Sequence, residues 1–386
     1  MTRLPAGIWA LGFVSLLMDV SSEMVHGLLP VFLTVSLGAG PALVGLVEGL
    51  GEAVAATMKL VSGRISDRMR RRKPLALAGY ALGALSKPVF ALAGSPAVVL
   101  GARVADRIGK GLRGSPRDAL IADLTPPERT GAAYGLRQAL DNVGAFVGPG
   151  LAALLMVAFA GDMRRVFAVA AIPGLAAVAL LALAVREPER PSRAAATIRP
   201  GWGALPGPVW RVIALAAFLT LARMSEAFAI LRATGLGLPL ALAPLVLVVI
   251  YAAAAVASYP AGALSDRIGP RHLLLSGLAV LAAADTVLAV APTAVVALAG
   301  AALWGVHLGL TQGLLSAMVA RATPADLRGT AFGAFHFASG VALLAASGGA
   351  GLIWQGWGAP AAFAASGVLA LAGFALLARH RSDSRD

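Results

Sequence analysis

Acidic residues stand at helical spacing inside long apolar segments of this chain. Asp19 and Glu23 are four residues apart in the first segment, and Glu48 and Glu52 repeat that spacing in the second. Side chains four residues apart lie on the same face of a helix, so each pair would point in one direction. A carboxylate at the centre of a bilayer costs roughly 2.5–3.5 kcal/mol or more unless it is paired or faces water. Acids kept there are suited to binding and releasing a proton.

Basic residues gather in the segment at about 96–122. Arg103, Asp106, Arg107 and Lys110 fall within a helical sector of about 100°. Burial favours the neutral form of a carboxyl group, whereas a nearby arginine favours the charged form, so displacing the arginine would switch protonation. The alternative interpretation is that these charges only neutralise one another between helices. So many buried charges are a costly way to hold helices together, which favours the proton-linked interpretation.

Most candidate residues for proton coupling and for a substrate cavity therefore lie in the N-terminal half. Arg137 and Asp141 are spaced i,i+4 in the fifth apolar segment, and in the C-terminal half Glu226 occupies about the place that Glu23 has in the first segment. The full candidate set is Asp19, Glu23, His26, Glu48, Glu52, Arg103, Asp106, Arg107, Lys110, Arg137, Asp141, Asn142 and Glu226.

A divalent cation is an alternative ligand for the first segment, because carboxylate and imidazole groups suit such ions. His26 shares the face of Asp19 and Glu23, but Met24 points away from it and no second histidine lies at ligand spacing. We therefore expect no metal site.

The elements that carry these residues are predicted to be membrane-spanning helices. Hydrophobic residues make up 58% of the chain and charged residues 13%, which excludes a water-soluble globule. Apolar segments of roughly 20 residues or more recur along the whole length, and the period-2 alternation of a barrel is missing. The fold is therefore an all-α membrane protein. Twelve spans are predicted at about 6–34, 41–66, 74–95, 96–122, 129–158, 163–185, 207–232, 239–265, 271–291, 293–321, 327–352 and 358–379.

The spans form two related halves. Residues 1–185 are predicted to form an N-terminal six-helix bundle, 186–206 a polar linker, and 207–386 a C-terminal six-helix bundle with a short tail. A motif in the loop after the second span recurs after the eighth, which indicates an internal duplication. Its two copies contain Gly63, Asp67 and Arg68, and Gly262, Asp266 and Arg267.

Lysine and arginine are distributed unequally between the two sides of the predicted membrane. Basic residues follow spans 2, 4, 8 and 10 and fill the linker and the tail, whereas most of the opposite loops carry no charge. By the positive-inside rule both termini and the linker are cytoplasmic, in the inner membrane of a bacterial cell. The formal net charge of +13 is therefore a topology signal, and we expect no nucleic-acid partner.

The duplicated motif resembles the loop motif of the major facilitator superfamily, and the resemblance covers essentially the whole chain. It implies two bundles related by pseudo-two-fold symmetry that move a solute by alternating access. In that family the acidic and basic residues of the motif steady one gating state, a role that carries over to Asp67, Arg68, Asp266 and Arg267. Arg70 stands where the family usually has glycine.

Two further motifs are similar to those of particular family members. Arg103 or Arg107 matches the arginine of proton-coupled members, and the spacing leaves both open. The segment Gly144-Ala-Phe-Val-Gly148-Pro149-Gly150 is similar to a motif of exporters. Small residues also recur wherever membrane helices pack closely, so this motif favours export only weakly.

The sequence therefore predicts a secondary transporter and not an enzyme. It contains no nucleotide-binding loop, and we expect no cofactor. The expected partners are a small-molecule substrate, protons and the lipid bilayer, and the chain is expected to be a monomer. Proton-coupled export of a small organic compound or drug is favoured, and proton-linked uptake of a metabolite or metal cation is the alternative.

Overall fold

The computed structural model describes residues 5–69, 71–125, 130–187, 202–324 and 327–379. These residues form helices and no strand, and each of the twelve predicted spans has a helical counterpart, so the predicted all-α fold is confirmed. Among the described residues, eight helical stretches are long and apolar enough to cross a membrane. α5 (Pro96–Leu124) is not among them, and it is the helix that carries the run of basic residues.

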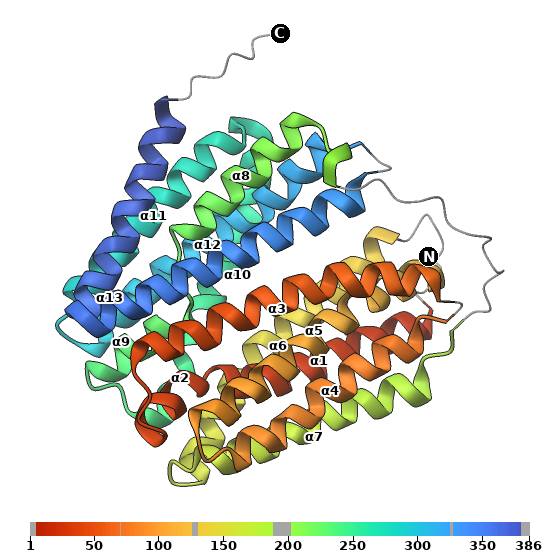
Figure 1. The fold of residues 1–386 in the computed structure, drawn as a ribbon, viewed down its shortest axis with the longest axis horizontal. Coiled ribbons are helices and arrows are strands. Elements are labelled where there is room, and N and C mark those ends of the chain that lie inside the picture. Colours follow the sequence, from red (N-terminus) through yellow and green to blue (C-terminus); the bar gives the residue numbers. More distant parts are fainter. Residues whose placement is uncertain (1–4, 70, 126–129, 188–201, 325–326, 380–386) are drawn as a thin grey trace. The chain divides into compact units, whose positions relative to one another are not determined.

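The helices of the N-terminal half begin and end close to the predicted limits. They are α1 (Ala6–His26), α2 (Leu29–Val31), the π-helix η1 (Phe32–Ser36), α3 (Pro41–Arg68), α4 (Lys73–Leu92), α5, α6 (Thr130–Ala158) and α7 (Met163–Ala184). α1 packs against α6 and α7, and α4 packs against α5 and α7 (Figure 1).

The C-terminal half contains α8 (Gly207–Leu221), α9 (Ala227–Gly235), α10 (Leu245–Ile268), α11 (Pro270–Val290), α12 (Ala294–Ala322) and α13 (Arg328–Arg379), with short 3₁₀ turns at η3 (Trp202–Ala204) and η4 (Leu240–Leu242). α13 holds the last two predicted spans, which meet at Gly358, where φ is 85°. α12 packs against α10 and α11, and α13 packs against α8 and α11.

The α-helix is interrupted inside two of the predicted spans. The first predicted span, at about 6–34, corresponds to one apolar stretch, Ala6–Ser36, but its α-helix α1 ends at His26. Pro30 is the cause, because it has no N–H group to donate to the carbonyl of His26. This break was readable from the sequence.

The seventh span, expected to be continuous at 207–232, breaks between α8 and α9. No proline lies in the gap. The freed backbone groups find partners on α13 instead: the carbonyl of Ala222 accepts a hydrogen bond from Ser366 at 2.8 Å, and the N–H of Ser225 donates to Ser347 Oγ at 3.1 Å. A helix can break inside a membrane where such groups satisfy its backbone.

The chain divides into two compact units. One consists of residues 1–38 and 50–199, and the other of residues 39–49 and 200–386. The first turns of α3 therefore pack with the second unit, where the backbone at Gly45 and Gly49 approaches Ser347 and Leu344 of α13. α3 thus contributes to both units.

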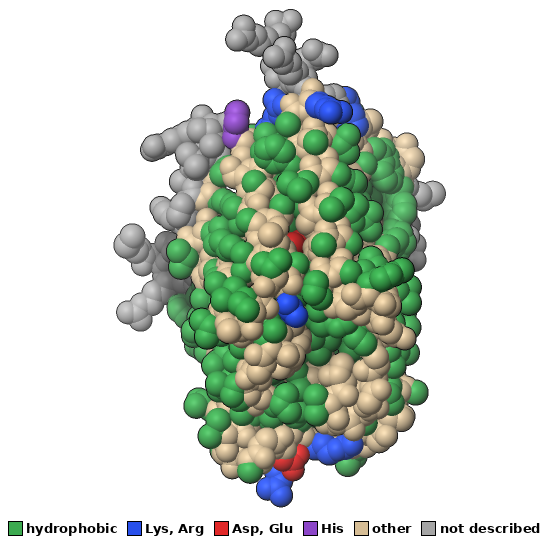
Figure 2. Space-filling view, turned by 90° about the vertical axis from the view of Figure 1, so that its left-hand side faces the viewer, with side chains coloured by type: hydrophobic (Ala, Val, Ile, Leu, Met, Phe, Trp, Pro, Cys, Tyr) green, Lys and Arg blue, Asp and Glu red, His purple; other side chains and the backbone are tan. Residues whose placement is uncertain are grey.

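Apolar side chains cover much of the outer surface. Figure 2 shows them over much of one face, with lysine and arginine gathered at the top and bottom of the view and a basic side chain also near its middle. Leu92, Leu183 and Val256 are more than three-quarters exposed, at 82%, 84% and 77%. Such exposure of large apolar groups is the arrangement expected of lipid-facing helices.

Candidate functional site

The acids of α1 lie where its backbone touches α6. A Cβ atom at Gly144 would lie 2.7 Å from the carbonyl oxygen of Leu16 and 3.0 Å from Cβ of Asp19. A Cβ atom at Gly148 would lie 2.8 Å from Cβ of Glu23. Small residues therefore form a close seam between the helices and hold both acids against α6. In this chain the exporter-like motif has a clear packing role.

Replacing Gly148 with valine is expected to push α6 away from α1, because the contacted atoms include backbone and cannot rotate aside. We expect a loss of about 1–3 kcal/mol in the free energy of unfolding. Gly150 is the matched control, since nothing lies within 4 Å of a Cβ atom there. Thermal unfolding in detergent would compare Gly148→Val with Gly150→Val, and equal melting temperatures would contradict the seam.

Glu23 pairs with a neighbour on its own helix. Its Oε2 atom lies 3.2 Å from Nδ1 of His26, and both side chains are largely buried, at 15% and 9% exposure. The structure thus brings together two members of the predicted acidic face. No group of three histidine or acidic side chains placed to hold a metal occurs within the described ranges.

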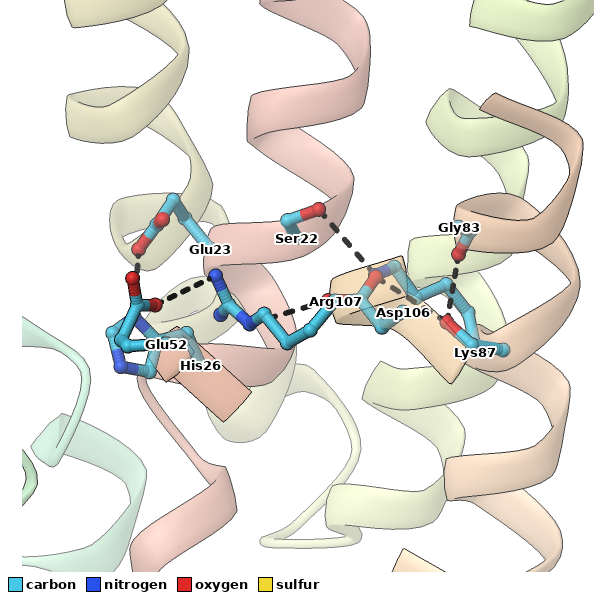
Figure 3. A network of polar contacts seen from close by, with 9 residues as sticks. Ser22, Glu23, His26, Glu52, Gly83, Lys87, Asp106 and Arg107 are labelled. Carbon is cyan, nitrogen blue, oxygen red and sulfur yellow. Dashed lines mark hydrogen bonds and ion pairs between the residues drawn. The ribbon is translucent and has the colours of Figure 1, made fainter. Parts of the chain in front are cut away.

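Arg107 of α5 forms an ion pair with Glu52 of α3. Its Nη1 atom lies 3.0 Å from Oε1 of Glu52, and its Nε atom lies 3.7 Å from Asp106 (Figure 3). Gly51 makes the approach possible, because a Cβ atom there would lie 3.3 Å from both Arg103 Nε and Arg107 Cγ. The Arg107 side chain is 3% exposed and that of Glu52 is 37% exposed. An accessible acid is therefore held by a buried arginine.

Lys87 of α4 is a site residue that the sequence analysis missed. Its Nζ atom lies 2.6 Å from Oδ1 of Asp106, and the two side chains are 1% and 4% exposed. Ser22 Oγ lies 3.4 Å from Nζ (Figure 3). Ser86 Oγ lies 3.4 Å from Oδ1 of Asp106. A single lysine inside the apolar segment at 74–95 was the available signal. The positive-inside rule considers only the basic residues of loops, so it gives no weight to Lys87.

Lys110 of α5 is a basic residue whose charge acts on acids of two other helices. It acts electrostatically on Asp19, Glu23 and Glu52, which come from α1 and α3. Within the described part of the chain it forms no ion pair of its own.

Three further arginines of the first unit make contacts that join its helices. Arg137 binds Asp141 on its own helix and lies 3.3 Å from Asp118 of α5. Arg117 donates to Ser15 Oγ at 2.9 Å, and Arg113 lies over the ring of Tyr80 with its Cζ atom 5.1 Å from the ring centre. These contacts join α1, α4, α5 and α6.

Three of the predicted site residues, Glu48, Asn142 and Glu226, lie apart from the contacts described above. Glu48 is 2% exposed and belongs to the turns of α3 that pack with the second unit. Asn142 lies on an exposed part of α6, and Glu226 lies at the N-terminus of α9 without a capping hydrogen bond from its side chain. Glu48 and Glu52 lie four residues apart in α3, as expected, but Glu48 belongs to the second unit and Glu52 to the first.

The two loop motifs lie at helix ends. Gly63, Asp67 and Arg68 are in the last turns of α3, and Gly262, Asp266 and Arg267 are in the last turns of α10. The side chains of these four charged residues lie outside the described ones, as does Arg70. Their gating contacts stay a prediction.

A described contact ties the neighbouring loop to the end of α7. The carboxylate of Glu187 accepts hydrogen bonds from the backbone N–H groups of Arg72 and Lys73 at the start of α4. Lys73 in turn donates from Nζ to the carbonyls of Ala182 and Val185, at 2.7 Å each. Each charge sits at the helix end that its sign favours.

An apolar hollow of about 540 Å³, open to the surface, lies within the second unit between α8 and α13. Trp202, Trp210, Phe218 and Phe337 contribute to its lining. Its described lining contains no charged side chain, in agreement with the scarcity of charges in this half of the sequence.

The chain is similar to known transporters along its length. A family model described as Major Facilitator Superfamily matches residues 11–250 and 212–386. An uncharacterized MFS-type transporter of Methanocaldococcus jannaschii is 32% identical over 361 residues, covering 92% of this chain and 89% of the relative. The multidrug resistance protein MdtH of Photorhabdus laumondii is 31% identical over 142 residues, which is 37% of this chain and 35% of that protein.

Solved structures have the same fold. A bacterial homolog of the human lysosomal transporter Spinster, in an inward-facing and occupied conformation, aligns with a TM-score of 0.79 at 17% identity. The alignment covers 97% of this chain and 96% of the other. At this identity the likeness concerns the fold.

Proposed function

Because the chain belongs to the Major Facilitator Superfamily, it is a membrane-embedded, multi-pass transporter and not an enzyme, and we propose that it exports a small organic compound in exchange for protons. Residues 1–185 and 207–386 would act as two bundles joined by the linker 186–206. Alternating access is rocking of such bundles about a site near the middle of the membrane.

The contact between Glu52 and Arg107 is the observation that carries the proposal. Glu52 is 37% exposed, whereas Arg107 is buried at 3% exposure. A proton arriving at Glu52 removes its negative charge and weakens this contact, so the balance of attraction on the buried guanidinium shifts toward Asp106, 3.7 Å from its Nε atom. Proton binding is thereby linked to a rearrangement of α5 against α3.

Two observations favour export over uptake. The glycine motif of α6 is similar to that of exporters, and the partial match with MdtH concerns a protein named for multidrug resistance. The partial match with MdtH also supports an organic, drug-like substrate. We also propose the inner membrane as the location, cytoplasmic termini on the basis of the loop charges, and a monomeric state.

Transport into liposomes would test the proposal. The purified protein is reconstituted with a pH-sensitive dye inside, and ethidium, an organic cation, is added outside together with uncharged and anionic dyes in separate trials. We expect accumulation of at least one compound when the interior is acidic, with alkalinisation of the interior and abolition by a protonophore. Empty liposomes are the control.

The sign of the effective gradient separates the alternatives. Accumulation driven by an acidic exterior would overturn exchange and support proton-linked uptake of a metabolite or metal cation. Accumulation that is equal with and without a gradient would overturn proton coupling altogether.

A further inference from the structure

A carboxyl group that the proposed coupling does not use lies inside the second unit. Asp285 of α11 is completely buried. Its Oδ2 atom lies 2.6 Å from Oγ of Ser366 on α13, and the same Oγ lies 2.8 Å from the carbonyl oxygen of Ala222. Ala222 directly follows α8, at the break in the seventh span. Asp285, Ser366 and Ala222 therefore form a chain of polar contacts that ends at this break.

Counting hydrogens shows which form of the carboxyl group fits. The hydroxyl group of Ser366 has one hydrogen and faces two oxygen atoms, both within hydrogen-bond distance. Both contacts are satisfied when Asp285 supplies a proton from Oδ2 to Ser366 Oγ, and Ser366 donates to Ala222. If the carboxyl group is ionised, one of the two acceptors loses its hydrogen bond.

The surroundings favour the same form. Oδ1 of Asp285 has no hydrogen-bond partner in the described part of the chain, which is costly for an ionised carboxylate away from water. α13 approaches closely at this level, since a Cβ atom at Gly367 would lie 3.5 Å from Cβ of Asp285. A protonated carboxyl group tolerates this dry position better than a charged one.

Neighbouring charged groups have other partners. Arg232 of α9 donates to the carbonyls of Leu288, Ala289 and Ala291 at 2.8–3.1 Å, which caps the end of α11. Arg223 lies over the ring of Trp304, and His307 of α12 contacts the carbonyl of Gly277 at 2.8 Å. No ion pair among the described side chains includes Asp285. The segments around Asp285 carry further titratable or charged groups. Those with described side chains are Arg211 on α8, Glu226 beside α9, Tyr251 on α10, Arg271 and His272 on α11, Arg321 on α12, and His336 and Arg379 on α13. The side chains of Tyr259, Asp266, Arg267 and Arg328 lie outside the described ones.

We propose that Asp285 is a second proton-binding site of the transporter, and that its proton holds the break in the seventh span through Ser366. Loss of the proton turns the hydroxyl group of Ser366 toward the carboxylate and leaves the carbonyl of Ala222 without its partner. The break then has to rearrange or bind water. The idea deepens the proposed proton exchange and rests on it for its role in transport.

Infrared difference spectra of the purified full-length protein would test the protonation directly. At neutral pH the spectrum of the wild type minus that of Asp285→Asn is expected to contain the carbonyl stretching band of one protonated carboxyl group. Ser366→Ala keeps the carboxyl group and removes its partner, so this band should shift to the frequency of a more weakly bonded group. Absence of the band from the difference spectrum would overturn the proposal.

Thermal unfolding against pH gives a second measurement. The amide of Asp285→Asn can donate to Ser366 as the protonated acid does, so this variant should fold and remain stable. The wild type is expected to lose thermal stability relative to Asp285→Asn as the pH rises from mildly acidic to alkaline, because only the wild type has a proton to lose. Parallel curves for the two proteins would contradict the proposal.

These readouts do not depend on transport. If liposome assays show no proton coupling while the infrared band is present, the proposed function fails and Asp285 remains a proton-binding site. If coupling is present and the band is absent, the inference about Asp285 fails and the proposed function stands.

Discussion

Asp106→Asn is expected to destabilise the protein by about 3–5 kcal/mol, the cost of breaking a buried ion pair from one side. The change leaves Lys87, whose side chain is 1% exposed, with the hydroxyl group of Ser22 at 3.4 Å as its other described partner. Lys87→Met should cost less, because Asp106 keeps Arg107 at 3.7 Å. The double variant removes both charges and should recover most of the loss.

Unfolding by heat or denaturant in detergent would measure these differences. The ion pair of Arg165 and Asp162 is a suitable control, since its atoms lie 3.0 Å apart but the side chains are 70% and 40% exposed. Arg165→Met is expected to change stability by about 0–1 kcal/mol, as for other exposed pairs. A loss in Asp106→Asn no larger than in Arg165→Met, or no recovery in the double variant, would show that Lys87 and Asp106 do not stabilise each other.

Arg107→Gln is expected to lower the rate of transport by about 10- to 150-fold. A hydrogen bond to a charged group contributes about 1.5–3 kcal/mol, and this is the corresponding change in rate if the bond acts during the transport cycle. Glu52→Gln should retain movement of the compound down its own gradient and lose the response to a pH gradient. The two variants therefore separate transport from coupling.

Arg103→Gln is the comparison that decides which arginine matches the proton-coupled family motif. Both arginines pack against Gly51, but Arg107 is the one whose Nη1 atom lies 3.0 Å from Glu52. Liposome assays of the three variants under equal and unequal pH would measure the effects. Normal coupling in both Arg107→Gln and Glu52→Gln would remove this pair from the mechanism, and loss of coupling in Arg103→Gln alone would assign the motif to Arg103.

Much of the fold was readable from the sequence because hydropathy and loop charges are local signals. The limits of α7 and α11 agree with the predicted spans to within a residue. The kink of the first span had a local cause in Pro30. The break of the seventh span had no local cause, because Ser347 and Ser366, which satisfy its backbone, lie more than 120 residues away.

The candidate site was predictable in its residue types and less so in its pairs. Spacing placed Asp19 with Glu23 and Arg137 with Asp141 on single helices. Partners on different helices depend on rotation and packing, so the pairing of Arg107 with Glu52 stood among several alternatives. Lys87 was missed because a lone charge has no periodicity, and its partner Asp106 lies on another helix.

The glycine seam between α1 and α6 also has a mechanical consequence. Helices whose backbones are in contact cannot slide or rotate past each other without opening the contact. We therefore expect α1 and α6 to move together as a rigid body. Asp19 and Glu23 lie at this contact, so a movement of their backbone would also move Gly144 and Gly148. We therefore expect bending of these two helices at positions beyond the seam, such as the end of α1 at Gly27 and the turn after α6, where Gly161 has a φ of 87°.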